Sequence, residues 1–215
     1  NPDDCNLNCV MCEEHSPYSP SHQARIKGEL PYRRMDIETI ENVIMECAGQ
    51  GLEEIIPSTM GEPLIYKHMP RIIDLCHEHG VKLNLTTNGT FPRLGAEEWA
   101  KLIVPIGSDV KFSWNGATSF AQRLVMNNND FEKNIDNLYT FIRIRDEHAS
   151  AGGNYCSVTL QMTFMDMNLD QVPRVVELAN SAGVDRVKGH HLWAHFKEIK
   201  DQNMRRNNDA IERWN

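Results

Sequence analysis

The sequence lacks any apolar run long enough to span a membrane, and it lacks an excess of basic residues. Its 22 Lys and Arg are outnumbered by 30 Asp and Glu, which gives a formal net charge of −8. Because phosphate binding favours a basic surface, this balance argues against a nucleic-acid partner. No signal-peptide pattern is present either, but the chain starts at Asn1 without a methionine, so this absence decides nothing about the compartment. We expect a globular protein with no membrane partner.

Cysteines are also scarce, since six in 215 residues are too few for a disulfide scaffold. Three of the six nevertheless fall within eight residues, as Cys5, Cys9 and Cys12 in a C-x3-C-x2-C pattern. Soft thiolates at this spacing bind a soft metal centre, for which iron–sulfur clusters and zinc are the usual occupants. Clustered metal-binding thiols fit a reducing compartment, so the cytoplasm is the expected location.

The number of ligands is the informative feature of this stretch. A structural zinc site or an electron-transfer cluster uses four protein ligands, and no fourth Cys or His follows at short, regular spacing. Three ligands on a four-iron cluster leave one iron open to an external ligand, which indicates a catalytic iron–sulfur site. Three alternatives stay open: ordinary thiols without a metal, a Cys3His zinc site completed by His15 in a binding or structural domain, and a simple iron–sulfur electron carrier.

Hydrophobic periodicity predicts alternating helices and strands from residue 36 onward. Strands are expected at 52–57, 81–88, 109–114 and 156–164, with a last one beginning near Val184. Helices are expected over 36–49, 69–80, 96–104, 131–142 and 172–179, the last capped by Asn168 or Asp170. Residues 13–35 carry no period and are predicted to be a loop, whereas Cys47 and Cys76 lie on apolar helix stripes and are predicted core residues.

This order of elements predicts an α/β fold with a parallel sheet, a partial (βα)6 TIM-like barrel. The cysteine stretch occupies the place of a βα loop, so the first strand is expected upstream of residue 1. No internal boundary is expected. Residues 1–195 are predicted to form the core, and residues 196–215 a polar tail or the start of a C-terminal extension.

Three of the predicted strands alternate between apolar and polar residues, although buried parallel strands are usually apolar throughout. The polar positions are Lys82, Asn84, Thr86 and Asn88, then Lys111, Ser113 and Asn115, then Ser157, Thr159, Gln161 and Thr163. A closed barrel normally fills its interior with branched apolar side chains. We therefore expect a polar, open lumen that holds a polar ligand, with a sheet that has one solvent-facing side as the alternative.

Ligand sites of such folds gather at the carboxyl ends of the strands. The residues expected there are Gly61-Glu62-Pro63, Asn88-Gly89, Ser113 to Gly116, Gln161 to Thr163, and Lys188 to His191. The cysteine stretch belongs on the same rim, so these groups are predicted to converge on one mouth.

Four of these motifs resemble those of the radical S-adenosylmethionine (SAM) enzymes. The cysteine motif is followed by Met60-Gly61-Glu62-Pro63, similar to G-G-E-P, by Thr86-Thr87-Asn88-Gly89-Thr90, similar to T-N-G-T, and by Ser113-Trp114-Asn115-Gly116, similar to S-x-D-G. Order and spacing agree over essentially the whole chain. Three residues depart from the family pattern: Met11 replaces an aromatic residue that packs on adenine, Met60 replaces a glycine, and Asn115 replaces an aspartate and cannot act as an acid or base.

The resemblance implies that Cys5, Cys9 and Cys12 hold a [4Fe–4S] cluster whose fourth iron is chelated by SAM. Reductive cleavage of SAM would give a 5′-deoxyadenosyl radical that abstracts hydrogen from a substrate, a peptide, a nucleotide or a small metabolite. A reductant of the flavodoxin or ferredoxin type is implied as a partner. The residues expected to bind the cofactor are Met11, Gly61, Glu62, Pro63, Asn88, Ser113, Asn115, Gln161 and Leu192.

No residue is assigned a catalytic role. Within the superfamily, the sequence resembles the molybdenum-cofactor branch and the peptide-modifying branches, many of which carry a C-terminal SPASM or twitch extension with auxiliary clusters. No cysteine occurs between Cys156 and residue 215.

The stretch from His190 to His195 carries three histidines. His191 and His195 have zinc-like spacing. The alternatives are a segment that closes the mouth against adenine or substrate, and ordinary surface histidines. Alternation along the last strand predicts that Lys188 and His190 point inward.

Overall fold

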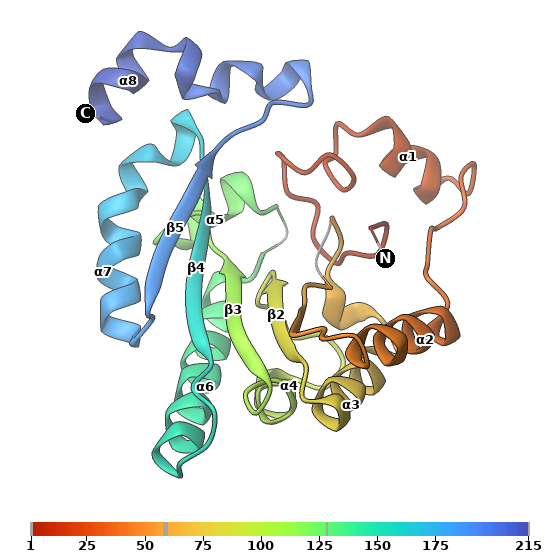
Figure 1. Ribbon diagram of the computed structural model, residues 1–215. Helices are drawn as coiled ribbons and strands as arrows, with labels where there is room; N and C mark the ends of the chain where they lie inside the picture. Colours follow the sequence, from red (N-terminus) through yellow and green to blue (C-terminus); the bar gives the residue numbers. More distant parts are fainter. Residues whose placement is uncertain (1, 58–59, 128, 215) are drawn as a thin grey trace.

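The computed structural model describes residues 2–57, 60–127 and 129–214, with the backbone alone for Arg206. Five parallel strands form one sheet in the order β1-β2-β3-β4-β5 (Figure 1). The strands are β1 (Glu54–Ile55), β2 (Lys82–Thr87), β3 (Gly107–Ser113), β4 (Ser157–Phe164) and β5 (Arg186–His191). Each strand pairs with the next one along the chain, so the predicted parallel α/β fold is confirmed. The strand expected upstream of residue 1 stays a prediction.

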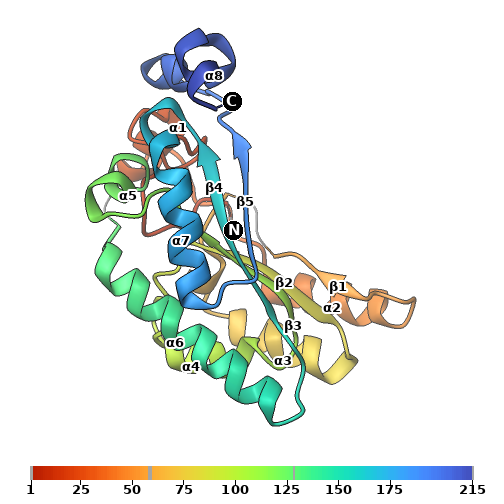
Figure 2. The same cartoon turned by 90° about the vertical axis from the view of Figure 1, so that its left-hand side faces the viewer.

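The helices between the strands follow the predicted apolar periods. They are α2 (Ile37–Ala48), α3 (Met69–His79), α4 (Ala96–Ile103), α6 (Phe131–Ser150) and α7 (Val172–Ala182). Helix α2 packs on α3, α3 on α4, α4 on α6 and α6 on α7. Figure 2 shows α4, α6 and α7 on one side of the sheet. Gly80 and Gly183 end α3 and α7 in the left-handed conformation that glycine adopts without strain.

The two faces of the sheet differ as the alternation predicts. Leu83, Leu85, Val110 and Phe112 are fully buried under the helices. Polar side chains on the opposite face bond to one another, for example Thr159 Oγ1 to Asp109 Oδ1 at 2.9 Å. The prediction of one apolar and one polar face is confirmed, whereas the open lumen that holds a polar ligand stays a prediction.

The expectation of a loop over residues 13–35 is wrong in part, because Pro20–Ile26 form helix α1. Ser19 caps it, its Oγ accepting a hydrogen bond from the His22 amide, and Pro20 occupies the first turn. Arg25 is the one residue of α1 that is buried. Helix α1 is short and its buried residue is the charged Arg25. Its sequence therefore has no apolar periodicity from which a helix could be predicted.

Helix α5 (Ser119–Val125) was also missed, and two further details need correction. Cys47 is exposed rather than in the core, because α2 buries only Ile44 completely. The residue before α7 is Gln171, whereas Asn168 lies in the preceding 3-10 segment η2 (Asp166–Gln171). There the Asn168 side chain accepts a hydrogen bond from the Met165 amide at 2.9 Å.

After β5 the chain turns over the carboxyl ends of β4 and β5 (Figure 1). It forms η3 (Lys197–Gln202), η4 (Met204–Arg206) and α8 (Asn208–Trp214). Ile199, Met204 and Ala210 are buried in this segment, so it packs on the fold although its sequence is polar. The assignment of residues 196–215 to a tail or to the start of an extension stays a prediction. No helix of the described residues is long and apolar enough to cross a membrane.

Candidate metal and cofactor site

The three clustered cysteines lie on a tight loop at the carboxyl edge of the sheet. Cys5, Cys9 and Cys12 are all half-buried free thiols. The Cys12 amide donates to the Cys9 carbonyl at 3.1 Å, and the loop is tied to the end of α5 by a bond from the Val10 amide to the Val125 carbonyl at 2.9 Å. The backbone therefore holds the three thiols in one region before any metal binds.

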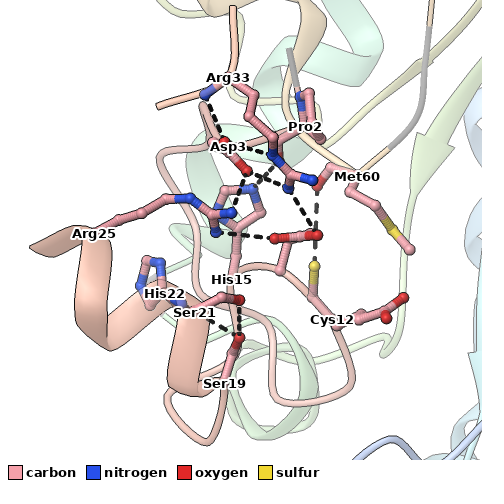
Figure 3. A network of polar contacts seen from close by, with 12 residues as sticks. Pro2, Asp3, Cys12, His15, Ser19, Ser21, His22, Arg25, Arg33 and Met60 are labelled. Atoms are coloured by element: carbon pink, nitrogen blue, oxygen red, sulfur yellow. Dashed lines mark hydrogen bonds and ion pairs between the residues drawn. The ribbon is translucent and has the colours of Figure 1, made fainter. Parts of the chain in front are cut away.

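A charge network centred on the buried Asp3 fixes the two flanks of this loop (Figure 3). Arg33 donates to Asp3 through its backbone amide and its guanidinium, at 2.6 to 2.9 Å. Arg25 bonds Glu14 at 2.9 Å and Asp3 at 3.1 Å. The Asp3 side chain is fully buried, and its hydrogen bonds from Arg33 lower its pKa to about 2. The network joins the residues before Cys5 to the residues after Cys12.

Residues 60–62, which precede η1 (Pro63–Ile65), lie beside the cysteines. The Glu62 amide donates to the Asp4 carbonyl at 2.8 Å, and the Cys12 thiol lies 3.9 Å from the Met60 carbonyl. The predicted convergence of Gly61-Glu62-Pro63 with the cysteine stretch is therefore present in the structure.

The Glu62 carboxylate is buried and holds the end of β2. Its Oε1 accepts hydrogen bonds from the Leu64 amide and the Thr87 hydroxyl, and its Oε2 accepts one from the Asn88 amide at 2.7 Å. Burial raises its pKa to about 7. A carboxylate offers about four acceptor positions, so about one remains after these three bonds. The buried Glu62 side chain therefore also has a structural role, because it holds the end of β2 in place. The motif alone does not predict this role.

Asn88 connects β2 to the cysteine loop. Its Nδ2 donates to Asn6 Oδ1 at 2.8 Å and lies 3.9 Å from the Cys5 sulfur. Asn6 in turn donates to Thr90 Oγ1 at 2.9 Å. The structure therefore brings the Asn88-Gly89-Thr90 turn against the first cysteine.

The ends of β3 and β4 supply the next two predicted groups. Ser113 and Gln161 are paired in the sheet register and half-buried on its polar face. Asn115 is buried, with its Oδ1 accepting from the Thr163 amide at 2.8 Å and its own amide donating to Gln122 at 2.7 Å. Asn115 therefore ties the two strand ends together, whereas the cofactor contacts expected of Ser113 and Gln161 stay predictions.

An apolar cluster lies under the cysteine loop. Leu7, Val125, Met126 and Leu192 are buried in it, with Cys5, Cys9 and Met11 packed against them, together with Met165, Ile199 and others. Leu192 is held at this cluster because its amide donates a hydrogen bond to the Phe164 carbonyl at 3.0 Å, which continues the β4–β5 strand pairing by one residue. The structure brings Met11 and Leu192 into one cluster with the cysteines, and their roles in binding the cofactor stay predictions.

The histidines do not form the zinc sites considered from the sequence. His15 is buried and its Nε2 bonds the Pro2 carbonyl at 2.7 Å. The His191 ring contacts Phe164 and Trp214, while His195 Nδ1 lies 4.0 Å from Glu13. Within the described ranges, no three His, Cys, Asp or Glu side chains are close enough to hold one metal ion.

Two contributors to the site were missed at the sequence level. The charge network of Asp3, Glu14, Arg25 and Arg33 joins residues up to 30 positions apart, which no periodicity reveals. Asn134 and Asn137 of α6 donate to the Asn88 and Gly89 carbonyls at 2.9 and 2.8 Å. Polar residues on the buried side of a long helix are the one signal that would have identified them.

A family model for the radical SAM superfamily matches residues 2–179. The chain belongs to the radical SAM superfamily. Members of this superfamily are enzymes whose radical chemistry depends on SAM and an iron–sulfur cluster, so the cofactors of this protein are a [4Fe–4S] cluster and SAM.

Curated relatives match part of the chain. A probable GTP 3',8-cyclase of Pyrococcus abyssi is 35% identical over 95 residues, which are 44% of this chain and 27% of that protein. The 7-carboxy-7-deazaguanine synthase of Methanocaldococcus jannaschii is 34% identical over 92 residues, or 41% and 37% of the two chains. The chain thus spans well under half of these relatives.

Solved structures share the fold over the full chain. The structure of native anSMEcpe with bound AdoMet (SAM) superposes with a TM-score of 0.72 at 16% identity, covering 100% of this chain and 56% of that one. Streptococcus suis SuiB bound to SAM gives 0.68 at 14% identity, covering 98% and 45%. These neighbours confirm the predicted partial barrel.

The three thiols fit a four-iron cluster better than a single ion. Burial, together with repulsion from Cys5 and Cys12, raises the pKa of the Cys9 thiol well above its usual value, so its thiolate needs a cationic partner. Ligands to three different irons stand farther apart than ligands to one ion, which agrees with the absence of a single-ion group among the described residues.

Proposed function

We propose that this protein uses its Cys5, Cys9 and Cys12 thiolates to bind a [4Fe–4S] cluster with one iron open to SAM. Such a cluster, once reduced, supplies the electron that cleaves SAM to a 5′-deoxyadenosyl radical, and this radical abstracts a hydrogen atom from a peptide or protein substrate. The observation that carries the proposal is the convergence of three free thiols, the Gly61-Glu62 loop and Asn88 on one edge of the sheet.

The chain's own residues bind and orient the cofactor. The carbonyls and the free acceptor position around Gly61 and Glu62 suit the ammonium group of SAM, because charge-assisted hydrogen bonds are strong in a buried site. Ser113 and Gln161, on the polar face, suit its carboxylate and ribose hydroxyls. Met11 and Leu192 supply the apolar surface for adenine and exclude water from the reacting end.

A peptide substrate is proposed because two structural neighbours were solved with peptides. One is SuiB bound to the precursor peptide SuiA, and the other is anSMEcpe with bound AdoMet and the Cp18Cys peptide. A reductant of the flavodoxin or ferredoxin type is the proposed redox partner.

Anaerobic reconstitution tests the proposal. We expect about four irons per chain, and formation of 5′-deoxyadenosine when dithionite and SAM are added. Cys5→Ala, Cys9→Ala and Cys12→Ala should each lose the cluster, whereas Cys47→Ala, at an exposed thiol outside the site, should retain it. One bound zinc, or a cluster that never cleaves SAM, would contradict the proposal and favour a structural domain or an electron carrier.

A further inference from the structure

A cavity of about 630 Å³ lies between the end of β5 and the segment that follows it. His190, His191 and Trp193 line one side, and Lys200, Asn203 and Arg205 line the other. Its volume is in the range of pockets that hold small molecules. None of the residues predicted to bind SAM, other than Leu192, belongs to its lining.

The lining is cationic in a protein whose net charge is −8. It contains Lys200, Arg205 and two histidines, and no carboxylate is among the described residues that form it. Within residues 2–57, 60–127 and 129–214, neither Lys200 nor Arg205 forms an ion pair. Two unpaired cations that face the same space leave a positive potential there, which an anion would neutralise.

The cavity is built by specific contacts rather than by two loose surface chains. Asn203 donates to the Leu192 carbonyl at 3.1 Å and accepts from the Arg205 amide at 3.1 Å, which fixes η4 against the end of β5. His191 Nδ1 is buried and has no hydrogen-bond partner among the described atoms. A buried polar atom without a partner is unusual in a folded protein and is satisfied when a ligand or water binds.

The cavity borders the cysteine loop. Leu192, which lines it, belongs to the apolar cluster that also holds Leu7 and against which Cys9 and Met11 pack. His190, also in the lining, lies within 3.3 Å of the Thr163 hydroxyl on the polar face of the sheet. A group bound in this cavity would therefore lie next to the place where the radical is generated.

We propose that this cavity binds an oxyanion of the substrate, a phosphate or a carboxylate, with Lys200 and Arg205 as its charged partners. The inference rests on the proposed function and narrows its substrate to one that carries an anionic group. Trp193, with 77% of its surface exposed, offers a flat face for the part of the substrate next to that anion.

Isothermal titration calorimetry on the anaerobically reconstituted protein, with SAM present, tests this assignment. Inorganic phosphate and malonate are the two probes, and the tighter one shows whether the substrate's anion is a phosphate or a carboxylate. We expect saturable binding that weakens as salt is added. Lys200→Ala and Arg205→Ala should each weaken it about tenfold, since each removes one charge-assisted hydrogen bond.

Lys67→Ala is the matched control, because Lys67 is an exposed lysine outside this lining and should leave binding unchanged. Circular dichroism confirms that each variant is folded. Absence of saturable binding for both anions, or equal affinities in Arg205→Ala and Lys67→Ala, overturns the assignment. Cluster content and 5′-deoxyadenosine formation by the unsubstituted protein test the proposed function separately.

Discussion

At the residue scale, the six cysteines divide into three environments. Cys5, Cys9 and Cys12 are half-buried at the site, Cys76 and Cys156 are fully buried, and Cys47 is exposed. Burial raises the pKa of Cys76 to about 11 and that of Cys156 to about 12. Because the thiolate is the reactive form, these two residues remain inert thiols at neutral pH.

This division predicts the alkylation pattern of the reconstituted protein. At mildly alkaline pH, iodoacetamide should modify Cys47 alone, since iron occupies three thiols and burial protects the other two. Mass spectrometry of peptides identifies the modified sites. Chelation of the iron should add the three site cysteines, and denaturation should add Cys76 and Cys156. Rapid labelling of Cys76 in the folded protein would contradict the buried position of this residue.

At the scale of elements, α6 does more than cover the sheet. Its apolar residues pack on α4, as the periodicity predicts, while Asn134 and Asn137 reach the loop after β2. Both amides are buried, so the carbonyls of Asn88 and Gly89 depend on them for a hydrogen bond. Gly89 has φ +77, and an added Cβ would lie 3.2 Å from Phe112, so the loop also requires glycine there.

We therefore predict that Asn137→Ala lowers the free energy of unfolding by about 1 to 3 kcal/mol, because it leaves a buried carbonyl without its donor. Urea unfolding followed by circular dichroism measures the change. The control is Asp136→Ala, on the exposed side of the same helix, which should change stability by less than about 0.5 kcal/mol. Equal effects of the two substitutions would mean that the amide contact is not made.

At the scale of the whole molecule, the two ends of the sheet have different roles. The carboxyl end carries the cysteines and the strand-end motifs. At the opposite end, Arg145 of α6 donates to Asp185 at 2.8 Å and to the Gly183 carbonyl at 2.8 Å. Asp185 also accepts from the Val158 amide at 2.7 Å. This cluster joins α6 to the starts of β4 and β5, far from the proposed chemistry.

Arg145→Ala should lower the free energy of unfolding by about 3 kcal/mol, because only 3% of the Arg145 side chain is exposed and its carboxylate partner loses its charge pair. Urea unfolding measures the loss. Arg143→Ala is the control, since its exposed pair with Glu147 on the same helix contributes less than about 1 kcal/mol. Iron content should be unchanged in both variants, and its loss in Arg145→Ala would contradict the separation of the two ends.

The sequence by itself determined the features that are written locally in the chain. The spacing of Cys5, Cys9 and Cys12 along the chain carries the proposal that these thiols bind a cluster. Side-chain alternation determines the polar face of the sheet, as Asn84 and Gln161 illustrate. The ends of the strands could be located because the alternation of apolar and polar side chains stops there.

Only the tertiary structure decided which distant groups meet. The pairing of Asp3 with Arg33, the burial of Glu62 under three hydrogen bonds, and the closure of residues 200–205 over His190 all depend on how the chain folds back on itself. Such contacts join segments that are distant in the sequence and have no common hydrophobic pattern. Their strength depends on the burial of the interacting groups, which a local sequence pattern does not predict. The proposal that the substrate carries an anionic group therefore depends on the tertiary structure, which brings residues 200–205 next to His190.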